Sequence, residues 1–276
     1  MQASAESDYQ QRFSGIARLY GAEGAARLRA AHVAIVGVGG VGSWSVESLA
    51  RSGIGALTLI DLDEVCVSNV NRQLPALTSE VGKPKVQVLR DRILGINPHC
   101  KVSAVEEFFT ATNVAEILAT PFTSVLDAID DVRNKSLLLA ECVRRQIPVV
   151  TVGGAGGRRD STAIRIADLA HSSHDKLLVR LRKILRVDYN FPTDPKTPFG
   201  IPCVYSIEPP VFPQSDGTVC EARGDATELR MNCNSGYGSA THVTGAFGFA
   251  AAAEVINGIV AAVSKYAPEP ASRSNS

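Results

Sequence analysis

The sequence predicts an α/β fold in which a doubly wound, mostly parallel sheet is covered by helices and completed by later strands and helices. Three observations carry this prediction. Short runs rich in β-branched residues alternate with amphipathic helical stretches through the first half of the chain. A glycine-rich turn joins the first such run to the first amphipathic stretch. The 276 residues are 45% hydrophobic, which suffices for a core without disulfides or metals.

Each element is expected from its local pattern. Strands are the short apolar runs bounded by turn residues, at 32–36, 57–60, 101–105, 123–127, 148–152 and 163–166. Helices are the stretches with apolar residues three or four positions apart, at 41–52, 85–96, 113–118, 133–146, 176–186 and 241–264. Residues 189–213 are interpreted as a Pro-rich connection. The strand–helix–strand repeats imply right-handed crossovers and a sheet covered on both faces.

Length, charge and cysteine content narrow the number of domains and the classes of function that are open to the chain. One folded domain is expected over residues 11–262, with disordered tails at 1–10 and 267–276. Lys and Arg number 28, as do Asp and Glu, so a globally basic nucleic-acid binder is excluded but a local basic patch is not. The six cysteines form no Cys-x-x-Cys pair, which argues against a zinc ribbon and favours a reducing compartment.

Two segments bear on location. The first 20 residues carry charges of both signs and no apolar run, so they match neither a secretory signal nor a transit peptide, and a cytoplasmic protein is expected. The apolar segment 243–263 approaches the roughly 20 residues that span a bilayer. Because Glu254 and Asn257 lie inside it, a buried core helix is favoured, with membrane association left open.

The glycine-rich turn predicts a nucleotide site. Gly37, Gly39 and Gly42 form a Gly-x-Gly-x-x-Gly pattern between a strand and a helix, which suits a tight turn, a close approach to phosphate and helix packing. The helix amino end beyond it offers free N–H groups to an anion. Asp61 ends the next strand, about 20 residues further on, where a carboxylate accepts hydrogen bonds from ribose hydroxyls.

The residues that follow favour ATP over a dinucleotide. Arg72 supplies a planar cation for phosphate oxygens and Lys85 a point charge, while Asn69 and Gln73 supply neutral donors. A hydride-transferring, NAD-dependent oxidoreductase has no need of such cations. An adenylating enzyme does, although the glycine pattern alone leaves both classes open.

Asp130 is the candidate magnesium ligand. It follows a predicted strand, so its carboxylate is expected at the carboxyl edge of the sheet, where it can hold Mg²⁺ against a triphosphate. An alternative is that Asp130 and Asp131 cap the next helix, because Asp is a common N-cap residue.

Together these motifs resemble the ThiF and MoeB superfamily, the bacterial adenylating relatives of ubiquitin-activating enzyme, whose fold is Rossmann-like. The resemblance rests on the motifs at residues 37–43, 59–63, 69–73, 82–85 and 127–131. Further motifs are similar to the superfamily's tRNA threonylcarbamoyladenosine dehydratases, at residues 12–21, 151–157, 205–206, 213–220 and 233–241. The similarity runs from about Gln11 to Ala262.

The resemblance implies an ATP-dependent enzyme that adenylates the threonyl carboxylate of threonylcarbamoyladenosine in tRNA and closes it to a cyclic hydantoin. An adenylyltransferase acting on the C-terminus of a ubiquitin-like sulfur carrier is the alternative, and a non-catalytic nucleotide-sensing scaffold is a third. The residues implied to bind nucleotide or metal, or to act in catalysis, are Arg18, Gly37, Gly39, Gly40, Gly42, Asp61, Asp63, Asn69, Arg72, Gln73, Lys85 and Asp130.

The resemblance also implies partners. Relatives are homodimers in which one subunit supplies an arginine to the other's site, and here Arg12 and Arg18 both match that arginine. Sulfur-relay proteins are possible partners. Structural zinc is not carried over, because the Cys-x-x-Cys pairs are missing. Of the thiols in subgroup motifs, Cys203 and Cys233, we expect Cys233 to be dispensable, since the substrate carries its own nitrogen nucleophile.

A basic helix is the candidate surface for tRNA. Residues 176–186 form an amphipathic stretch in which leucines and Ile184 make one stripe and Lys176, Arg180, Lys183 and Arg186 lie near one another on the other side. RNA phosphates are the expected partner, with a solvated face or membrane headgroups as alternatives. Arg158 and Arg159 are expected to extend this patch.

Overall fold

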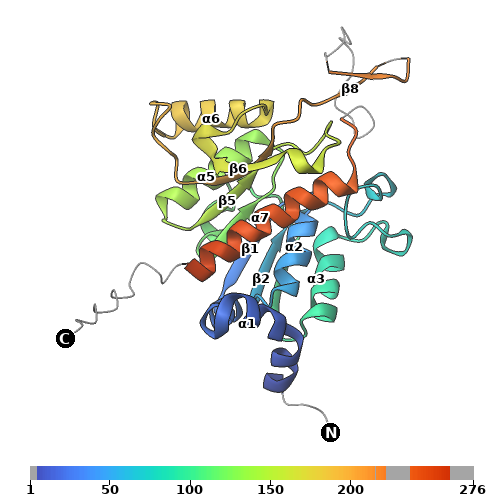
Figure 1. The fold of residues 1–276 in the computed structure, drawn as a ribbon, viewed down its shortest axis with the longest axis vertical. Helices are drawn as coiled ribbons and strands as arrows, with labels where there is room; N and C mark the ends of the chain where they lie inside the picture. Colours follow the sequence, from blue (N-terminus) through green and yellow to red (C-terminus); the bar gives the residue numbers. More distant parts are fainter. Residues whose placement is uncertain (1–4, 215, 222–236, 262–276) are drawn as a thin grey trace, which may run out of the picture.

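The computed structural model describes residues 5–214, 216–221 and 237–261. Its centre is a seven-stranded sheet in the order β3-β2-β1-β4-β5-β7-β6 (Figure 1), in which only β6 runs antiparallel to its neighbour. The strands are β1 (His32–Val36), β2 (Ala56–Ile60), β3 (Lys101–Val105), β4 (Ser124–Asp127), β5 (Val149–Val152), β6 (Ile164–Asp168) and β7 (Pro202–Ser206), with a separate pair β8 (Phe212–Pro213) and β9 (Val219–Cys220). The strand order reverses between β1 and β4, where ligands bind in doubly wound sheets.

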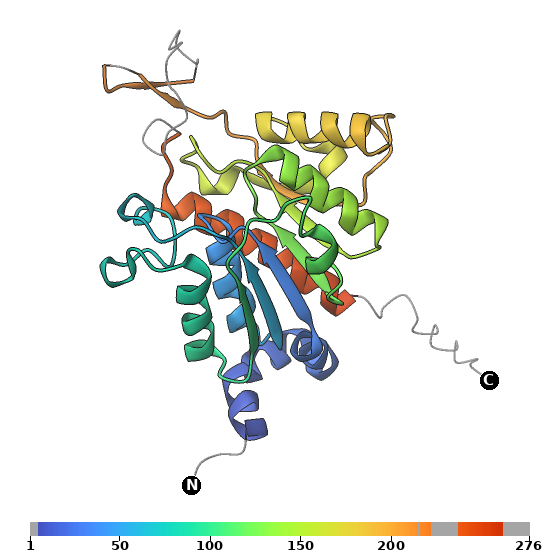
Figure 2. The same ribbon diagram turned by 180° about the vertical axis from the view of Figure 1, so that it is seen from behind.

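Helices cover both faces of the sheet, which confirms the predicted fold class. The helices α2, α3 and α7 lie in front in Figure 1, whereas α5 and α6 lie in front when the molecule is seen from behind in Figure 2. The helices are α1 (Ala5–Ala30), α2 (Gly42–Arg51), α3 (Lys85–Ile96), α4 (Val114–Ile117), α5 (Val132–Arg144), α6 (Lys176–Asp188) and α7 (Thr241–Ala261).

Successive side chains along a strand point to opposite faces of the sheet, which explains why the sheet has a core on either side. Val33 and Ile35 of β1 join the cluster beneath α2, α3 and α7, whereas Ala34 and Val36 join the cluster beneath α4, α5 and α6. Strands that are buried on both faces read as continuous apolar runs, as parallel strands do.

The apolar composition of α7 is explained by packing. This helix is long and apolar enough to cross a membrane, yet 56% of its most apolar window is buried inside the protein. Val243, Phe247, Ala251 and Val255 belong to the core cluster, and α7 packs along α2 and over the sheet. It therefore serves as a core helix, as favoured from the sequence.

Two elements depart from the predictions. Residues 5–10, predicted as part of a tail, are helical in α1, where Tyr9 is buried and donates a hydrogen bond from its hydroxyl to the carbonyl of Gly53. The predicted connection 189–213 contains β7, which lies between β5 and β6. The prolines around this short run hid a strand whose partners are distant in sequence.

A buried ion pair holds the end of β4. Lys135 Nζ lies 2.8 Å from Asp127 Oδ2, and both side chains are fully buried. Thr151 Oγ1 donates to the same carboxylate oxygen at 2.6 Å, and Lys135 Nζ also donates to the carbonyl of Ile129 at 3.1 Å. Because α5 and β5 both bond to Asp127, the loop that leaves β4 has one position.

We predict that Lys135→Met destabilises the protein by about 3–5 kcal/mol, because it leaves the Asp127 carboxylate buried and unpaired. The double variant Asp127→Asn with Lys135→Met should recover much of that loss, since no buried charge remains. Equilibrium urea unfolding measures both effects. Lys83→Met, at a solvent-exposed pair with Glu80, is the control and should leave the midpoint near that of the wild type. A Lys135→Met variant as stable as this control would contradict the account.

Candidate nucleotide-binding site

The glycine-rich turn between β1 and α2 is built against the end of β4. Gly37 has a φ of 85°, and a Cβ at this position would lie 2.8 Å from the carbonyl oxygen of Ala128. At Gly42 a Cβ would lie 1.9 Å from the carbonyl oxygen of Gly37, so no side chain fits there. The turn thus brings the amino end of α2 to the edge of the sheet where the strand order reverses, a favourable place for phosphate.

Asp61 connects this turn to the segment after β2. Its Oδ2 accepts a hydrogen bond from the backbone N–H of Val38 at 2.8 Å, and its Oδ1 accepts one from the N–H of Asp63 at 2.9 Å. Burial raises the pKa of the Asp61 carboxyl, while these N–H groups and Lys85 oppose that rise. Each oxygen retains a lone pair, so the carboxylate can also accept from ribose hydroxyls.

Lys85 places a buried positive charge beside this carboxylate. It is the first residue of α3 and only 4% exposed, and its Nζ lies 2.7 Å from Oδ2 of Asp63, which is half-exposed. A buried ammonium at the open edge of a sheet, with a half-exposed carboxylate as its partner, is available to a more highly charged anion such as a triphosphate. The structure therefore brings Asp61, Asp63 and Lys85 together.

Arg72 is held at the same edge by its backbone. Its carbonyl accepts hydrogen bonds from Trp44 Nε1 at 3.0 Å and from Thr244 Oγ1 at 3.1 Å, which come from α2 and α7. One guanidinium nitrogen, Nη1, donates to the carbonyl of Ser68 at 2.7 Å and to Asn71 Oδ1 at 3.2 Å. Within the described residues the other guanidinium nitrogens have no partner, so they are free to meet phosphate oxygens.

Two amides complete the segment. Asn69 is buried and accepts from the N–H of Cys66 through Oδ1 at 3.1 Å, which leaves its Nδ2 free of partners among the described residues. Gln73 is 8% exposed and lies beside Gly39, and its Oε1 has no hydrogen-bond partner in the described part of the chain. A buried acceptor without a partner is costly, so this oxygen calls for a donor next to the glycine turn, such as a water molecule or a hydroxyl or N–H group of a ligand.

The structure separates the two interpretations of the acidic pair after β4. Asp131 caps α5 by accepting from the N–H of Asn134 at 2.9 Å. Asp130 is exposed and has no partner among the described residues. No cluster of three or more metal-binding side chains occurs in the described part of the chain. A lone carboxylate beside a phosphate turn nevertheless suits Mg²⁺, which commonly binds one or two carboxylates together with phosphate oxygens.

Neither candidate arginine of α1 reaches the site of its own chain. Helix α1 lies by the amino ends of the strands, away from the loops that carry the site (Figure 1). Arg12 is engaged with Asp8 at 2.8 Å and with the carbonyl of Ile96 at 3.4 Å. Arg18 is exposed and has no hydrogen bond or ion pair among the described residues.

The basic helix α6 is present, but the patch is smaller than predicted. Lys176, Arg180 and Lys183 are exposed, whereas Arg186 is half-buried, donates to the carbonyl of Pro192 at 3.1 Å and lies over the ring of Phe199. The prediction that Arg158 extends the patch is wrong, because its side chain is 3% exposed and lies 3.6 Å from Asp175. Instead, the Arg158 guanidinium donates hydrogen bonds to the backbone carbonyls of Gly154, His174 and Glu208. These bonds link three loops to one another.

Of the two thiols in the subgroup motifs, only Cys203 lies in the described part of the chain, and it is not a candidate nucleophile. Cys203 is fully buried in β7, and burial raises the pKa of its thiol. A buried, protonated thiol is inert. Cys233 lies outside the described residues.

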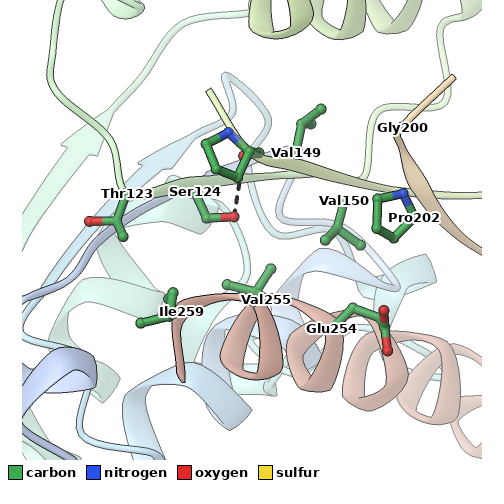
Figure 3. A pocket seen from close by; sticks show the side chains of 11 residues that line it. Thr123, Ser124, Val149, Val150, Gly200, Pro202, Glu254, Val255 and Ile259 are labelled. Carbon is green, nitrogen blue, oxygen red and sulfur yellow. Dashed lines mark hydrogen bonds between the residues drawn. The ribbon is translucent and has the colours of Figure 1, made fainter. Parts of the chain in front are cut away.

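A cavity of about 300 Å³ lies elsewhere, between α7 and the amino ends of β4, β5 and β7 (Figure 3). Its lining is mostly apolar, and its side-chain polar groups are those of Thr123, Ser124 and Glu254. It holds no cation, so it does not suit a triphosphate.

Sequence reasoning missed the side chains that support the site. Lys135, Trp44 and Thr244 contact no expected ligand, yet they hold the β4 loop and the Arg72 backbone. Only a lysine inside an otherwise amphipathic helix could have drawn attention to Lys135.

Comparisons with known proteins show the family and the fold of this chain. The model of the ThiF family matches residues 13–273. The tRNA threonylcarbamoyladenosine dehydratase of Haemophilus influenzae is 48% identical over 250 residues, which cover 91% of this chain and 94% of that protein. The dehydratase of Escherichia coli is 48% identical over 254 residues, or 92% of this chain and 95% of that one. A solved structure of the Escherichia coli dehydratase in complex with ATP has a TM-score of 0.85 and 41% identity, covering 96% of this chain and all (100%) of that one. This chain belongs to the ThiF family.

Proposed function

We propose that this chain is an ATP-dependent tRNA threonylcarbamoyladenosine dehydratase. The observation that carries the proposal is the convergence, at one sheet edge, of a phosphate turn, the ribose acceptor Asp61 and the cations Arg72 and Lys85. The similarity to named dehydratases over more than nine-tenths of the chain supports the same substrate.

The chemistry explains why ATP is required. A carboxylate oxygen is a poor leaving group, so the threonyl carboxylate attacks the α-phosphorus of ATP, pyrophosphate leaves, and an acyl adenylate forms. The exocyclic nitrogen N6 of the adenine, which carries the threonylcarbamoyl group, then attacks the acyl carbon and loses its proton, AMP leaves, and the five-membered hydantoin ring closes. Ring closure is intramolecular and needs no enzyme thiol, because the nucleophile is already tethered.

The residues of the site neutralise and orient the triphosphate. Arg72 and Lys85 stabilise charge that builds on pyrophosphate as it leaves, and Asn69 and Gln73 orient phosphate oxygens through their amides. Asp61 holds the ribose. Asp130 would hold a Mg²⁺ ion, which would supply further neutralisation of the negative charge of the triphosphate.

Activation of a ubiquitin-like sulfur carrier is the alternative with the same chemistry. The similarity to dehydratases extends through the second half of the chain, beyond the nucleotide site. That extent favours the tRNA substrate. Sulfur-relay partners remain a prediction from the family resemblance.

Arg18 is proposed to act across a homodimer. It is exposed and unpartnered among the described residues, whereas Arg12 is tied to Asp8 and to the end of α3. Because α1 lies away from its own nucleotide site, Arg18 can reach a triphosphate only in a second copy of the chain (Figure 1). In a two-fold dimer both sites gain an arginine in this way.

The exposed face of α6 is proposed to contact tRNA phosphates. Asp175 caps this helix and its Oδ2 accepts from the N–H of Gly154 at 2.8 Å, so the helix begins beside the carboxyl end of β5. Lys176, Arg180 and Lys183 therefore extend from the edge that carries the nucleotide site. A row of exposed cations on a rigid helix suits an RNA backbone.

We predict that Arg72→Ala and Lys85→Ala each lower kcat/KM about ten- to a hundredfold, the equivalent of ~1.5–3 kcal/mol for one charge-assisted contact.

Asp130→Asn should abolish adenylation and leave tRNA binding intact. Pyrophosphate release with tRNA substrate measures activity, and filter binding measures affinity for tRNA.

Two variants serve as matched controls for these charges. Lys83→Ala removes a neighbouring cation that pairs with Glu80, and Asp131→Asn alters the N-cap one residue after Asp130. Both should retain nearly full specific activity in the folded fraction. If Arg72→Ala and Lys85→Ala release pyrophosphate at the same rate as these controls, the assignment of the nucleotide site is wrong.

The homodimer can be tested by complementation. Arg18→Ala and Lys85→Ala alone should each lose most of their activity, about ten- to a hundredfold, but a mixed dimer keeps one complete site. An equimolar mixture after subunit exchange should therefore regain about one quarter of wild-type activity, since half of the dimers are mixed and each has one site of two. No recovery in a mixture shown to exchange would contradict a shared site.

The contribution of α6 can be read from salt dependence. Neutralising Arg180 and Lys183 should weaken tRNA binding and flatten the logarithmic salt slope by about 1.4, at ~0.7 per phosphate contact. Neutralising Arg90 and Lys101, which are exposed elsewhere, removes the same charge and should change the slope less. If the two double variants have equal salt slopes for tRNA binding, the exposed face of α6 does not contact the tRNA.

A further inference from the structure

An aromatic pair lies next to the amino end of α6. The rings of Phe212 and Tyr237 are 5.2 Å apart at an interplanar angle of 45°, and Nζ of Lys176 lies 5.4 Å from the Phe212 ring centroid. The three residues come from β8, the segment before α7 and the first turn of α6. We call Phe212, Tyr237 and Lys176 the aromatic seat.

The seat is held by backbone hydrogen bonds and close packing, although Tyr237 is 47% exposed. Its ring lies directly on the glycine loop after β5, because a Cβ at Gly156 or Gly157 would come within 2.9 or 2.8 Å of Tyr237. The N–H of Gly157 donates to the carbonyl of Gly238 at 2.7 Å, and the N–H of Val211 donates to the carbonyl of Gly157 at 2.8 Å. Three segments are thus bonded together around a ring that is left open to solvent.

The seat is also coupled to the nucleotide site. Asn71, which precedes Arg72, donates from Nδ2 to the carbonyl of Ser239 at 2.8 Å, and its carbonyl accepts from Thr241 Oγ1 at 2.6 Å. Two residues after Tyr237, therefore, the chain is bonded to the segment that carries the triphosphate cation. A molecule bound on Tyr237 lies beside the site where adenylation takes place.

A fixed, exposed aromatic ring beside a cation is the pattern with which proteins hold unpaired nucleotides, since the base stacks on the ring and the phosphate meets the cation. We propose that Tyr237 stacks with the purine of the modified adenosine and that Lys176 contacts a phosphate beside it. This inference rests on the proposed function. Stacking would orient the threonylcarbamoyl arm towards the triphosphate and would make adenylation selective for an unpaired purine.

The direct test is spectroscopic. The chain has one tryptophan, Trp44, so Tyr237→Trp adds a second emitter whose fluorescence a stacked base quenches. Titration of this variant with tRNA carrying threonylcarbamoyladenosine should quench emission beyond the change seen with the wild type. The same tRNA with that base removed should not. Equal quenching by both RNAs, or no added quenching, would overturn the proposal.

Affinity gives a second readout. Tyr237→Leu should raise the Kd for the modified tRNA about five- to 150-fold, as expected for the loss of one stacked base, and Tyr237→Phe should stay within about threefold of the wild type. Lys176→Ala should weaken binding more than Lys101→Ala, a lysine exposed at the amino end of β3. ATP binding should be unchanged in all four. Wild-type affinity for Tyr237→Leu, or equal loss in Tyr237→Phe, would overturn the proposal.

Failure of the proposed function would look different. If the modified tRNA quenches the emission of Tyr237→Trp but the wild-type protein forms no cyclic product with ATP, the stacking proposal holds and the dehydratase activity is rejected. If the wild-type protein forms the cyclic product but the base causes no quenching of Tyr237→Trp, the dehydratase activity holds and the stacking proposal is rejected.

Discussion

The buried ion pair between Asp127 and Lys135 constrains the whole nucleotide edge of this molecule. Two charges removed from water are tolerable only when each is paired and its remaining hydrogen-bonding capacity is used, and here Thr151, the carbonyl of Ile129 and the N–H of Ile129 complete the pair. The cluster thereby gives the loop from Ala128 to Asp130 one conformation. Removing either charge would release that loop.

The same loop sets the position of the phosphate turn. The N–H of Ala128 donates to the carbonyl of Val36 at 2.9 Å, and the backbone of Ala128 leaves room only for glycine at position 37. Asp61 then bonds to Val38 on the other side of the turn. The glycine turn, the proposed ribose acceptor Asp61 and the exposed Asp130 carboxylate are therefore placed by one chain of contacts that starts in the core. Catalysis by orientation needs such preorganisation.

The local patterns were sufficient to predict the strands from β1 to β6, α3 and the nucleotide motif, because each depends on residues close in sequence. Helix α1 was missed because it contains Gly21, where φ is 75° and the helix kinks, and because its apolar face is weak. Strand β7 was missed because its partners, β5 and β6, are supplied by tertiary structure. Charge alone suggested that Arg158 faces RNA, but only the folded chain shows it buried beside Asp175, and only the fold brings Tyr237 to Phe212.

The central claim is that the chain activates a tRNA-borne carboxylate as an acyl adenylate. The most direct measurement uses tRNA whose threonyl carboxylate carries oxygen-18, incubated with the wild-type protein and ATP, followed by mass spectrometry of the nucleotide products. Attack of the carboxylate on the α-phosphorus transfers one labelled oxygen to AMP when the ring closes, so labelled AMP and unlabelled pyrophosphate are expected in step with cyclic nucleoside. Label in inorganic phosphate, or cyclisation with unlabelled AMP, would contradict the account.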